Sequence, residues 1–288
     1  HGQTEGNPLF VSEMTRLLLQ EQALEGAACG SSSASHAGRL LRIPEGIKEV
    51  IGQRLNRLSL QANQVLTCAA VIGRSFDTAL LARLVDELDE EALTDALEEA
   101  LQANVIEALP TTPGRYHFGH ALFREILYDE IAPPRRGRLH LKVGRALEAA
   151  HCHDPGRYLP ALAHHYWAAL PGGDPALAVA YALRAAEQAD KLLAHEEAVR
   201  YYGLALQGMD AGTGVDALSR CRVLNALGEA HARGGEYLQS REVFEQAAHL
   251  ATDANSTHEL ARAALGFETA SWAPGVPGVA AARVLREA

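Results

Sequence analysis

Two segments in the C-terminal half of this 288-residue chain share one pattern of residue sizes. In each segment a small residue is followed four positions later by an aromatic residue, and three positions after that by a second small residue. Spacings of three and four residues lie on one face of an α-helix, so each segment is expected to bury that face against a neighbouring helix. A chain that repeats such a unit folds by stacking one helical unit on the next. The residues are Ala198, Tyr202 and Ala205 in the first segment and Ser240, Phe244 and Ala247 in the second, 42 residues further on.

The pattern is that of the second helix of a tetratricopeptide repeat (TPR), in which small residues let two helices approach and the aromatic residue fills the space between repeats. Leu227, Gly228 and His231 supply a matching first helix, and Leu265 and Gly266 begin another. The two copies are 42 residues apart, which is longer than the standard repeat of about 34 residues, so we interpret them as degenerate copies with longer connections. The alternative is a generic Ala-rich helical bundle.

From residue 135 onward we find no convincing strand and predict TPR-like helical repeats over residues 135–288. Hydrophobic residues make up 48% of the chain and aromatic residues only 6%, which is typical of stacked helices rather than of a β-sandwich. The predicted helices cover residues 136–152, 157–170, 175–190, 194–209, 217–233, 237–251, 257–270 and 278–288.

A different order of elements is predicted for residues 59–134. One helix runs from its N-cap Ser59 to Gly73, and two more cover residues 77–85 and 89–103. Short β-like runs at 105–109 and 115–118 are joined by the turn sequence TTPG at 111–114. A further helix over 121–131 is expected to stop at the two prolines 133 and 134. Three helices followed by a two-stranded hairpin indicate a winged-helix domain.

Residues 1–58 are predicted to form a small helical lid. A helix over 7–25 carries an apolar face, a Gly-, Ser- and Ala-rich loop covers 26–38, and a second helix begins near Pro44 and includes Ile51, Leu55 and Leu58. The predicted fold class is therefore mainly α: a helical lid, a winged-helix domain with a small β-hairpin, and a TPR-like α-solenoid.

The balance of charge argues against direct nucleic-acid contact. The formal net charge of −10 repels a phosphate backbone, and residues 89–103, the expected recognition helix, are strongly acidic where a major-groove helix needs Arg, Lys, Asn or Gln. The basic run RRGR at 135–138 is interpreted as a solvated linker. No apolar run reaches the ~18 residues that a membrane-spanning helix requires, so no membrane contact is expected.

No catalytic motif is present in the sequence. It contains neither the GxxxxGK[ST] phosphate-binding loop nor a GxSxG or SxxK nucleophile, so this chain by itself is not expected to be an enzyme. Cys68 and Cys221 lie in apolar helical patterns and are expected to be small buried hydrophobic residues. The four cysteines form no CxxC pair, which favours a reducing, cytoplasmic setting.

A group of histidines raises the question of a metal site. The candidates are His151, Cys152 and His153, with His164 and His165 further on. They lack zinc-site spacing, and adjacent ligands on one helix point in different directions. We therefore interpret them as a surface histidine cluster and expect no metal in this chain.

Four segments, in order, resemble the signal-transduction ATPases with numerous domains, the STAND class of the AAA+ superfamily. They are residues 4–11 (TEGNPLFV), 43–55, 69–76 (AAVIGRSF) and 115–125 (RYHFGHALFRE). The similarity spans residues 1 to roughly 210. Within the class, the chain is most similar to the large ATP-binding LuxR-type regulators and to the predicted ATPases attached to nucleotide cyclase domains.

The resemblance implies that a Gly-x-Pro turn packs against the adenine of bound ATP or ADP, which assigns this contact to Gly6, Asn7 and Pro8. The fixed φ and flat ring of a proline suit that role. From the residues alone, the first-turn position of a helix is the better interpretation of Pro8, and the resemblance is what favours the nucleotide contact.

The resemblance also points to His120, which is similar to the histidine of a Met-His-Asp motif that reaches the β-phosphate of ADP and holds such ATPases closed. This sequence departs from the motif, because Ala121 replaces the Asp and Phe118 and Gly119 precede the histidine. The alternative is that His120 caps the helix over 121–131.

Together these features predict the regulatory and sensor portion of a nucleotide-switched transcription regulator. The chain begins inside a motif and ends in mid-helical pattern, so we expect a C-terminal piece whose P-loop core lies upstream. Its repeats would bind a protein or small-molecule inducer, with self-association on activation. The alternative is a nucleotide-independent TPR scaffold for protein–protein interaction.

Overall fold

The computed structural model describes residues 51–272, except residues 53, 86, 154, 171 and 213–215. The chain divides into two compact units, His1–Ile47 and Lys48–Ala288, and the described residues belong to the second. The predicted lid helix over 7–25 and the predicted helix over 278–288 lie outside the described residues. At the end of the predicted lid, Ile51, Leu55 and Leu58 are buried, as their spacing predicts.

Helix α3 (Leu60–Ile72) begins at a cap that also joins it to a second helix. Ser59 Oγ accepts a hydrogen bond from the N–H of Ala62 at 3.1 Å, which is the predicted N-cap contact. The carboxylate of Glu99, in α5 (Glu90–Gln102), accepts hydrogen bonds from Ser59 N at 2.7 Å and from Ser59 Oγ at 2.6 Å. These two hydrogen bonds fix the start of α3 against α5.

The predicted hairpin is present and belongs to a larger sheet. Strands β2 (Ile106–Ala108) and β3 (Arg115–Phe118) pair antiparallel, and β3 also pairs with β1 (Ser75–Asp77), which gives the order β1-β3-β2. The helix predicted over 77–85 is present as the short helix α4 (Thr78–Ala82), and strand β1, which was not predicted, directly precedes it. A strand of three residues shows no alternating pattern, and the partner of β1 lies far along the chain, so the sequence did not indicate it.

Helix α6 (Ala121–Asp129) ends before the two prolines, as predicted, and helix α7 (Pro133–Ala150) begins earlier than the predicted range of 136–152. The prolines at 133 and 134 do more than follow the end of α6, because they occupy the first positions of α7. A proline is tolerated there because a backbone N–H at these positions would have no partner within the helix. Residues 135–138, predicted to be a solvated linker, form the first turns of α7. Gly137 is buried there, although Arg135 and Arg138 are exposed.

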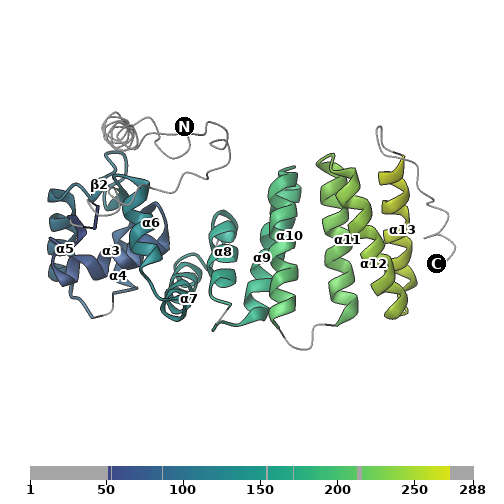
Figure 1. The fold of residues 1–288 in the computed structure, drawn as a ribbon, viewed down its shortest axis with the longest axis horizontal. Helices are drawn as coiled ribbons and strands as arrows, with labels where there is room; N and C mark the ends of the chain where they lie inside the picture. Colours follow the sequence, from purple (N-terminus) through teal and green to yellow (C-terminus); the bar gives the residue numbers. More distant parts are fainter. Residues whose placement is uncertain are drawn as a thin grey trace, which may run out of the picture. The chain divides into compact units, whose positions relative to one another are not determined.

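The remaining elements are helical, and each packs against the next along the chain (Figure 1). Their bounds agree with the predicted ranges within about three residues. No described helix has both the length and the apolar content needed to cross a membrane. The elements are η1 (Gly156–Tyr158), α8 (Leu159–Ala168), α9 (Pro175–Lys191), α10 (His195–Ala211), α11 (Ala217–Arg233), α12 (Tyr237–Asp253) and α13 (Thr257–Ser271).

Three turns between these helices share one backbone geometry. Leu193, Gly235 and Asn255 adopt the left-handed conformation, with φ values of 58°, 81° and 50°. In each turn the residue after the left-handed one donates its N–H to the carbonyl of the residue five positions before it, at 2.9 Å. This hydrogen bond is the one that defines a Schellman motif. The turns at Leu193 and Gly235 are 42 residues apart, the same offset as the side-chain pattern. The repeat is therefore present in the backbone as well as in the side chains.

The packing of Phe244 shows why the pattern combines an aromatic residue with small ones. Its ring, 1% exposed, lies between Gly228 of α11 and Gly266 of α13. A Cβ atom at Gly228 would lie 2.8 Å from the ring, and one at Gly266 would overlap it. All six residues of the two predicted copies are buried, so the predicted role of the pattern in helix packing is confirmed.

A carboxylate links three successive helices. Glu148 of α7 accepts hydrogen bonds from Tyr166 of α8 and Tyr181 of α9, each at 2.5 Å, and the two rings stack with centroids 5.0 Å apart. The hydrogen bonds from Tyr166 and Tyr181 lower the pKa of the Glu148 carboxyl, while burial and the bond to Glu148 raise the pKa of Tyr181 to about 12. The carboxylate form is thus the one that joins α7 to α8 and α9.

Substitution of Gly266 tests the packing around Phe244. We expect Gly266→Ala to lower the free energy of unfolding by about 1–3 kcal/mol, because the new methyl group overlaps the Phe244 ring. The matched control is Gly203→Ala in α10, where a Cβ meets nothing within 4 Å and the change should raise stability by up to about 1 kcal/mol. Thermal unfolding followed by circular dichroism measures both. Equal shifts for the two variants would contradict the packing argument.

Replacement of Glu148 tests the three-helix link. The folded-state pKa of Glu148 lies below its ordinary value of 4.5, so its stabilisation is present above that pH and is lost as pH falls through the folded value. We expect Glu148→Gln to lower the free energy of unfolding by about 1 kcal/mol at pH 7, since the side chain is only partly buried. The difference from the wild type should shrink at acidic pH, and Glu125→Gln, an exposed position on α6, should show none. A difference that is constant with pH would refute the carboxylate link.

Candidate functional site

Of the predicted nucleotide contacts, His120 is the one within the described residues; Gly6, Asn7 and Pro8 lie outside them. His120 is the N-cap of α6 and directly follows β3 and Gly119. Its Nδ1 accepts a hydrogen bond from the N–H of Leu122 at 3.2 Å. The capping interpretation of His120 therefore describes its local geometry.

The cap also determines which nitrogen of His120 carries the proton. A ring nitrogen that accepts a hydrogen bond is unprotonated, so the neutral imidazole holds its proton on Nε2. An Nε2–H is a donor that suits a phosphate oxygen, and the start of a helix favours an anion. The cap thus uses Nδ1, and the phosphate contact expected from the resemblance would use the other ring nitrogen, Nε2.

Helix α6 is anchored to the core of the winged-helix domain next to this cap. Arg124 Nε donates to the carbonyl of Ala70 in α3 at 3.1 Å, and Leu122 and Phe123 are buried. Space is tight at Gly119, where an added Cβ would lie 3.2 Å from a carboxylate oxygen of Glu107. The His120 backbone is therefore held by packing on both sides.

The solvent side of α5 is acidic, as predicted. The buried residues of this helix are Leu93, Ala96, Leu97 and Ala100. Its exposed side chains include those of Glu90, Glu91, Asp95 and Glu98. The sequence prediction that this helix does not enter a DNA groove rests on these carboxylates.

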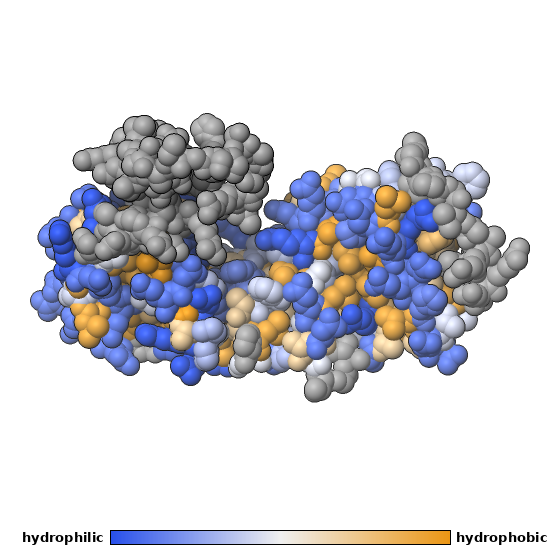
Figure 2. All heavy atoms as spheres, viewed as in Figure 1, coloured by the Kyte–Doolittle hydropathy of each residue, from blue (hydrophilic) through white to orange (hydrophobic). Residues whose placement is uncertain are grey.

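The repeat helices expose apolar side chains among charged ones, and Figure 2 shows such side chains over α11 and α12. Repeat arrays use extended surfaces of this kind to bind partners. The most exposed large hydrophobic residues of the described repeats are Leu192, Leu193, Leu238, Leu265 and Trp272, which is 80% exposed.

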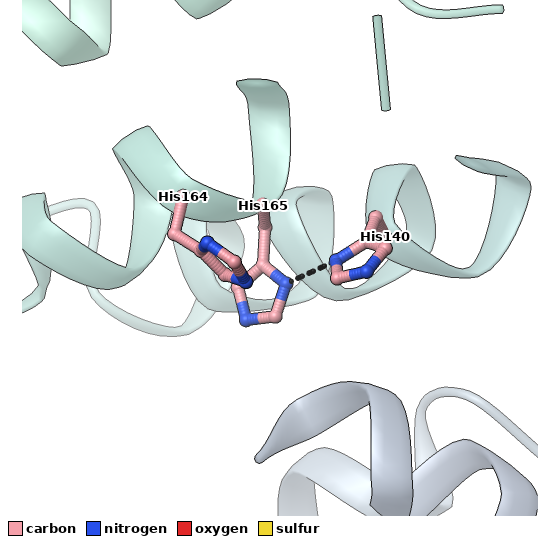
Figure 3. Close-up of side chains that lie close together, drawn as sticks. All are labelled: His140, His164 and His165. Atoms are coloured by element: carbon pink, nitrogen blue, oxygen red, sulfur yellow. Dashed lines mark hydrogen bonds between the residues drawn. The ribbon is translucent and has the colours of Figure 1, made fainter. Parts of the chain in front are cut away.

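A second group of functional side chains lies where α7 meets α8. His140 of α7 is fully buried, His165 of α8 is 3% exposed, and His164 of α8 is exposed. Figure 3 shows the three rings side by side, with His164 and His165 on one helix and His140 on its neighbour. We call these residues the histidine triad. Each offers one ring nitrogen, and these atoms lie within 4.8 Å of one another, an arrangement that no other group of described residues matches.

Hydrogen bonds connect the triad to the winged-helix domain. The Nδ1 atoms of His140 and His165 are 2.9 Å apart, so one ring donates and the other accepts. On its other side, His140 Nε2 is 2.8 Å from the hydroxyl of Tyr128 in α6. The guanidinium of Arg136 lies over the Tyr128 ring, 4.4 Å from its centroid. A continuous polar chain therefore runs from α6 through α7 to α8.

Burial keeps the triad neutral. It lowers the pKa of His140 to about 4, with smaller contributions from His164, Arg124 and Arg136. Burial also lowers the pKa of His165 well below its ordinary value, and partial burial and Arg124 lower that of His164. These shifts favour the neutral form of all three rings, which is the form of imidazole that binds metals.

The triad corrects the prediction of surface histidines at His165, whereas His164 is exposed as predicted. His165 is buried, and its partner His140 was not among the histidines considered. The signal was available, since His140 precedes the buried residues Val143, Gly144 and Leu147 at helical spacing, and His165 follows Leu162 in the same way. The contact between the two helices was not predictable from spacing along one helix. His153, by contrast, is exposed as predicted.

Comparison with known proteins does not assign the chain to a family. No family model matches the chain, and no curated protein matches it. Among solved structures, the chain is similar to the crystal structure of a signal transduction ATPase with numerous domains (STAND) protein with a tetratricopeptide repeat sensor from Pyrococcus horikoshii, at 12% identity and a TM-score of 0.30. The match covers 89% of this chain and 40% of that one. A TM-score of 0.30 is too low to support a conclusion about fold or function.

Two substitutions at His120 test the cap. We expect His120→Ala to lower the free energy of unfolding by about 1 kcal/mol, because the N–H of Leu122 loses its acceptor. His120→Asp should restore or exceed the wild-type stability, since Asp is a preferred N-cap residue. Urea unfolding of the two variants and the wild type provides the measurement. Equal losses in both variants would show that His120 stabilises the chain by packing rather than by capping.

Proposed function

We propose that this chain is the regulatory and sensor portion of a nucleotide-switched signal-transduction ATPase of the STAND class, acting as a cytoplasmic transcription regulator of the LuxR type. The observation that carries the proposal is the packing of α7, which contacts α3 and α4 of the winged-helix domain and also α8 of the repeats. Because α7 packs against both groups of helices, movement of the repeats would be passed to the winged-helix domain in the proposed switch.

The repeats are the proposed receiver of the signal. They stack helix on helix, and exposed apolar residues such as Trp272 and Leu238 suit a protein or small-molecule inducer. The acidic side of α5 supports a winged helix that packs and senses rather than one that binds DNA. Self-association on activation and the identity of the output domain are further parts of the proposal.

The role of a nucleotide in this proposal is supported by the family resemblance and by the geometry of His120. In the proposed switch, an upstream core binds ATP or ADP, Gly6, Asn7 and Pro8 face the adenine, and the Nε2–H of His120 donates to a phosphate of ADP. ADP then stabilises a closed form, and inducer together with ATP favours an open form able to assemble. ATP hydrolysis belongs to the upstream core, and no catalytic residue is assigned to this chain.

One observation favours the alternative of a nucleotide-independent TPR scaffold. His120 already has a structural role as the cap of α6, which requires no nucleotide. On this alternative the repeats bind a partner and the winged-helix domain serves only to end the array.

The two proposals differ in nucleotide content. We expect a longer chain that includes the upstream core to co-purify with adenine nucleotide, detected by chromatography after heat denaturation. In that chain His120→Asp should reduce ADP retention at least about tenfold, because the cap is kept while a carboxylate faces the phosphate. His249→Asp, at an exposed histidine of α12, is the matched control and should retain ADP. A protein that purifies without nucleotide would favour the scaffold, and unchanged retention in His120→Asp would remove His120 from the site.

A further inference from the structure

The histidine triad has the composition and spacing of an incomplete metal site. Three imidazole nitrogens lie within 4.8 Å of one another, and a tetrahedral centre with Zn–N bonds of about 2.0–2.1 Å separates its ligand nitrogens by about 3.3 Å. The Nδ1 atoms of His140 and His165 are already closer than this, at 2.9 Å. Adjacent residues of one helix usually point in different directions, but the His164 and His165 rings approach each other, with centroids 5.2 Å apart. The exposed His164 ring also lies 5.5 Å from the His140 ring, measured between centroids.

A metal would replace the hydrogen between the two buried rings. In the metal-free pair, one Nδ1 must carry a proton that it shares with the other. If both rings instead hold their protons on Nε2, both Nδ1 lone pairs face the same point. His140 Nε2–H then donates to the hydroxyl of Tyr128, 2.8 Å away, which is the outer-shell bond that orients a metal-binding histidine. Each ring stays neutral, and no proton has to leave the protein.

We propose that His140, His164 and His165 bind one divalent transition-metal ion of the zinc class at the junction of α6, α7 and α8, with Tyr128 as a positioning residue. This inference goes beyond the proposed function and does not depend on it. The described residues supply three nitrogen ligands, so the ion keeps a further position for water or an exogenous ligand, as open zinc sites do.

The surroundings of the triad select the class of ion. Imidazole ligands suit zinc, copper and nickel, whereas magnesium and calcium require oxygen ligands. Nearby Arg124 and Arg136 place positive charge close to His140, which opposes any cation, so a bound ion must form strong bonds with neutral imidazole. Magnesium and calcium, which require oxygen ligands, are therefore disfavoured at this site.

The position of the site gives it a structural consequence. His140 lies on the helix that contacts both the winged-helix domain and α8, and Tyr128 comes from α6. An ion bound to His140, His164 and His165 would cross-link α7 to α8 while holding α6 through Tyr128. Bound metal should therefore stabilise the chain against unfolding.

Equilibrium dialysis of the full chain against Zn²⁺, with the protein freed of metal and carrying no polyhistidine tag, tests the site. We expect one equivalent to bind, and Co²⁺ to give the visible absorption of a tetrahedral nitrogen-ligated centre. His164→Ala should weaken binding at least about tenfold and abolish the metal-dependent rise in unfolding temperature. Because His164 is exposed, this variant should fold. Tyr128→Phe should weaken binding by about 10- to 100-fold, as for loss of an outer-shell partner.

The matched control is His153→Ala, at an exposed histidine outside the triad. This variant should bind Zn²⁺ as tightly as the wild type. The proposal is overturned if the wild type binds no more tightly than His164→Ala, or if His153→Ala loses the ion while His164→Ala keeps it. Unchanged affinity in Tyr128→Phe would overturn the role of Tyr128. None of these measurements involves nucleotide, so they are independent of the test of the proposed function.

Discussion

Close approach of neighbouring helices is the constraint on which the repeat region depends. Fully buried positions of α9 and α10 are occupied by Ala182, Ala186, Ala198 and Ala205, whose side chains bury little apolar area. Such helices gain stability only when their backbones come close enough for dense packing. Phe244 then fills the space left between Gly228 and Gly266, where no Cβ is present. Small and aromatic residues are therefore parts of a single packing arrangement.

The junction between the winged-helix domain and the repeats is organised differently, by buried polar groups. Tyr128, His140 and His165 form a chain of hydrogen bonds across three helices, and a buried polar group left without a partner is costly. At α11 and α13 a similar solution appears, where Asn225 donates to the carboxylate of Glu259 at 2.9 Å. Polar partners have directional requirements that apolar contacts lack, so such bonds set how adjacent helices align. This directionality suits a region proposed to transmit movement.

Local elements were predictable where their signal was local and long. The helices of the repeat region run for many residues with apolar side chains at regular spacing, so their existence and approximate bounds followed from periodicity. Strand β1 shows the limit, because three residues carry no period and are held by pairing with a distant strand. The prolines at 133 and 134 fit both an end and a beginning of a helix, and only the packing of α7 distinguished them.

For the candidate sites, too, local features were predictable from the sequence and contacts between helices were not. By itself, the sequence determined which helices form, that small and aromatic residues alternate on their buried faces, and that His120 stands at a helix start, because each depends on the spacing of nearby residues. The tertiary structure decided that His120 caps through Nδ1 and that His140 meets His164 and His165. It also decided that Glu148 joins two tyrosines from later helices. These contacts depend on how one helix is rotated and placed against the next, and that placement results from packing along the whole interface, which no local pattern specifies.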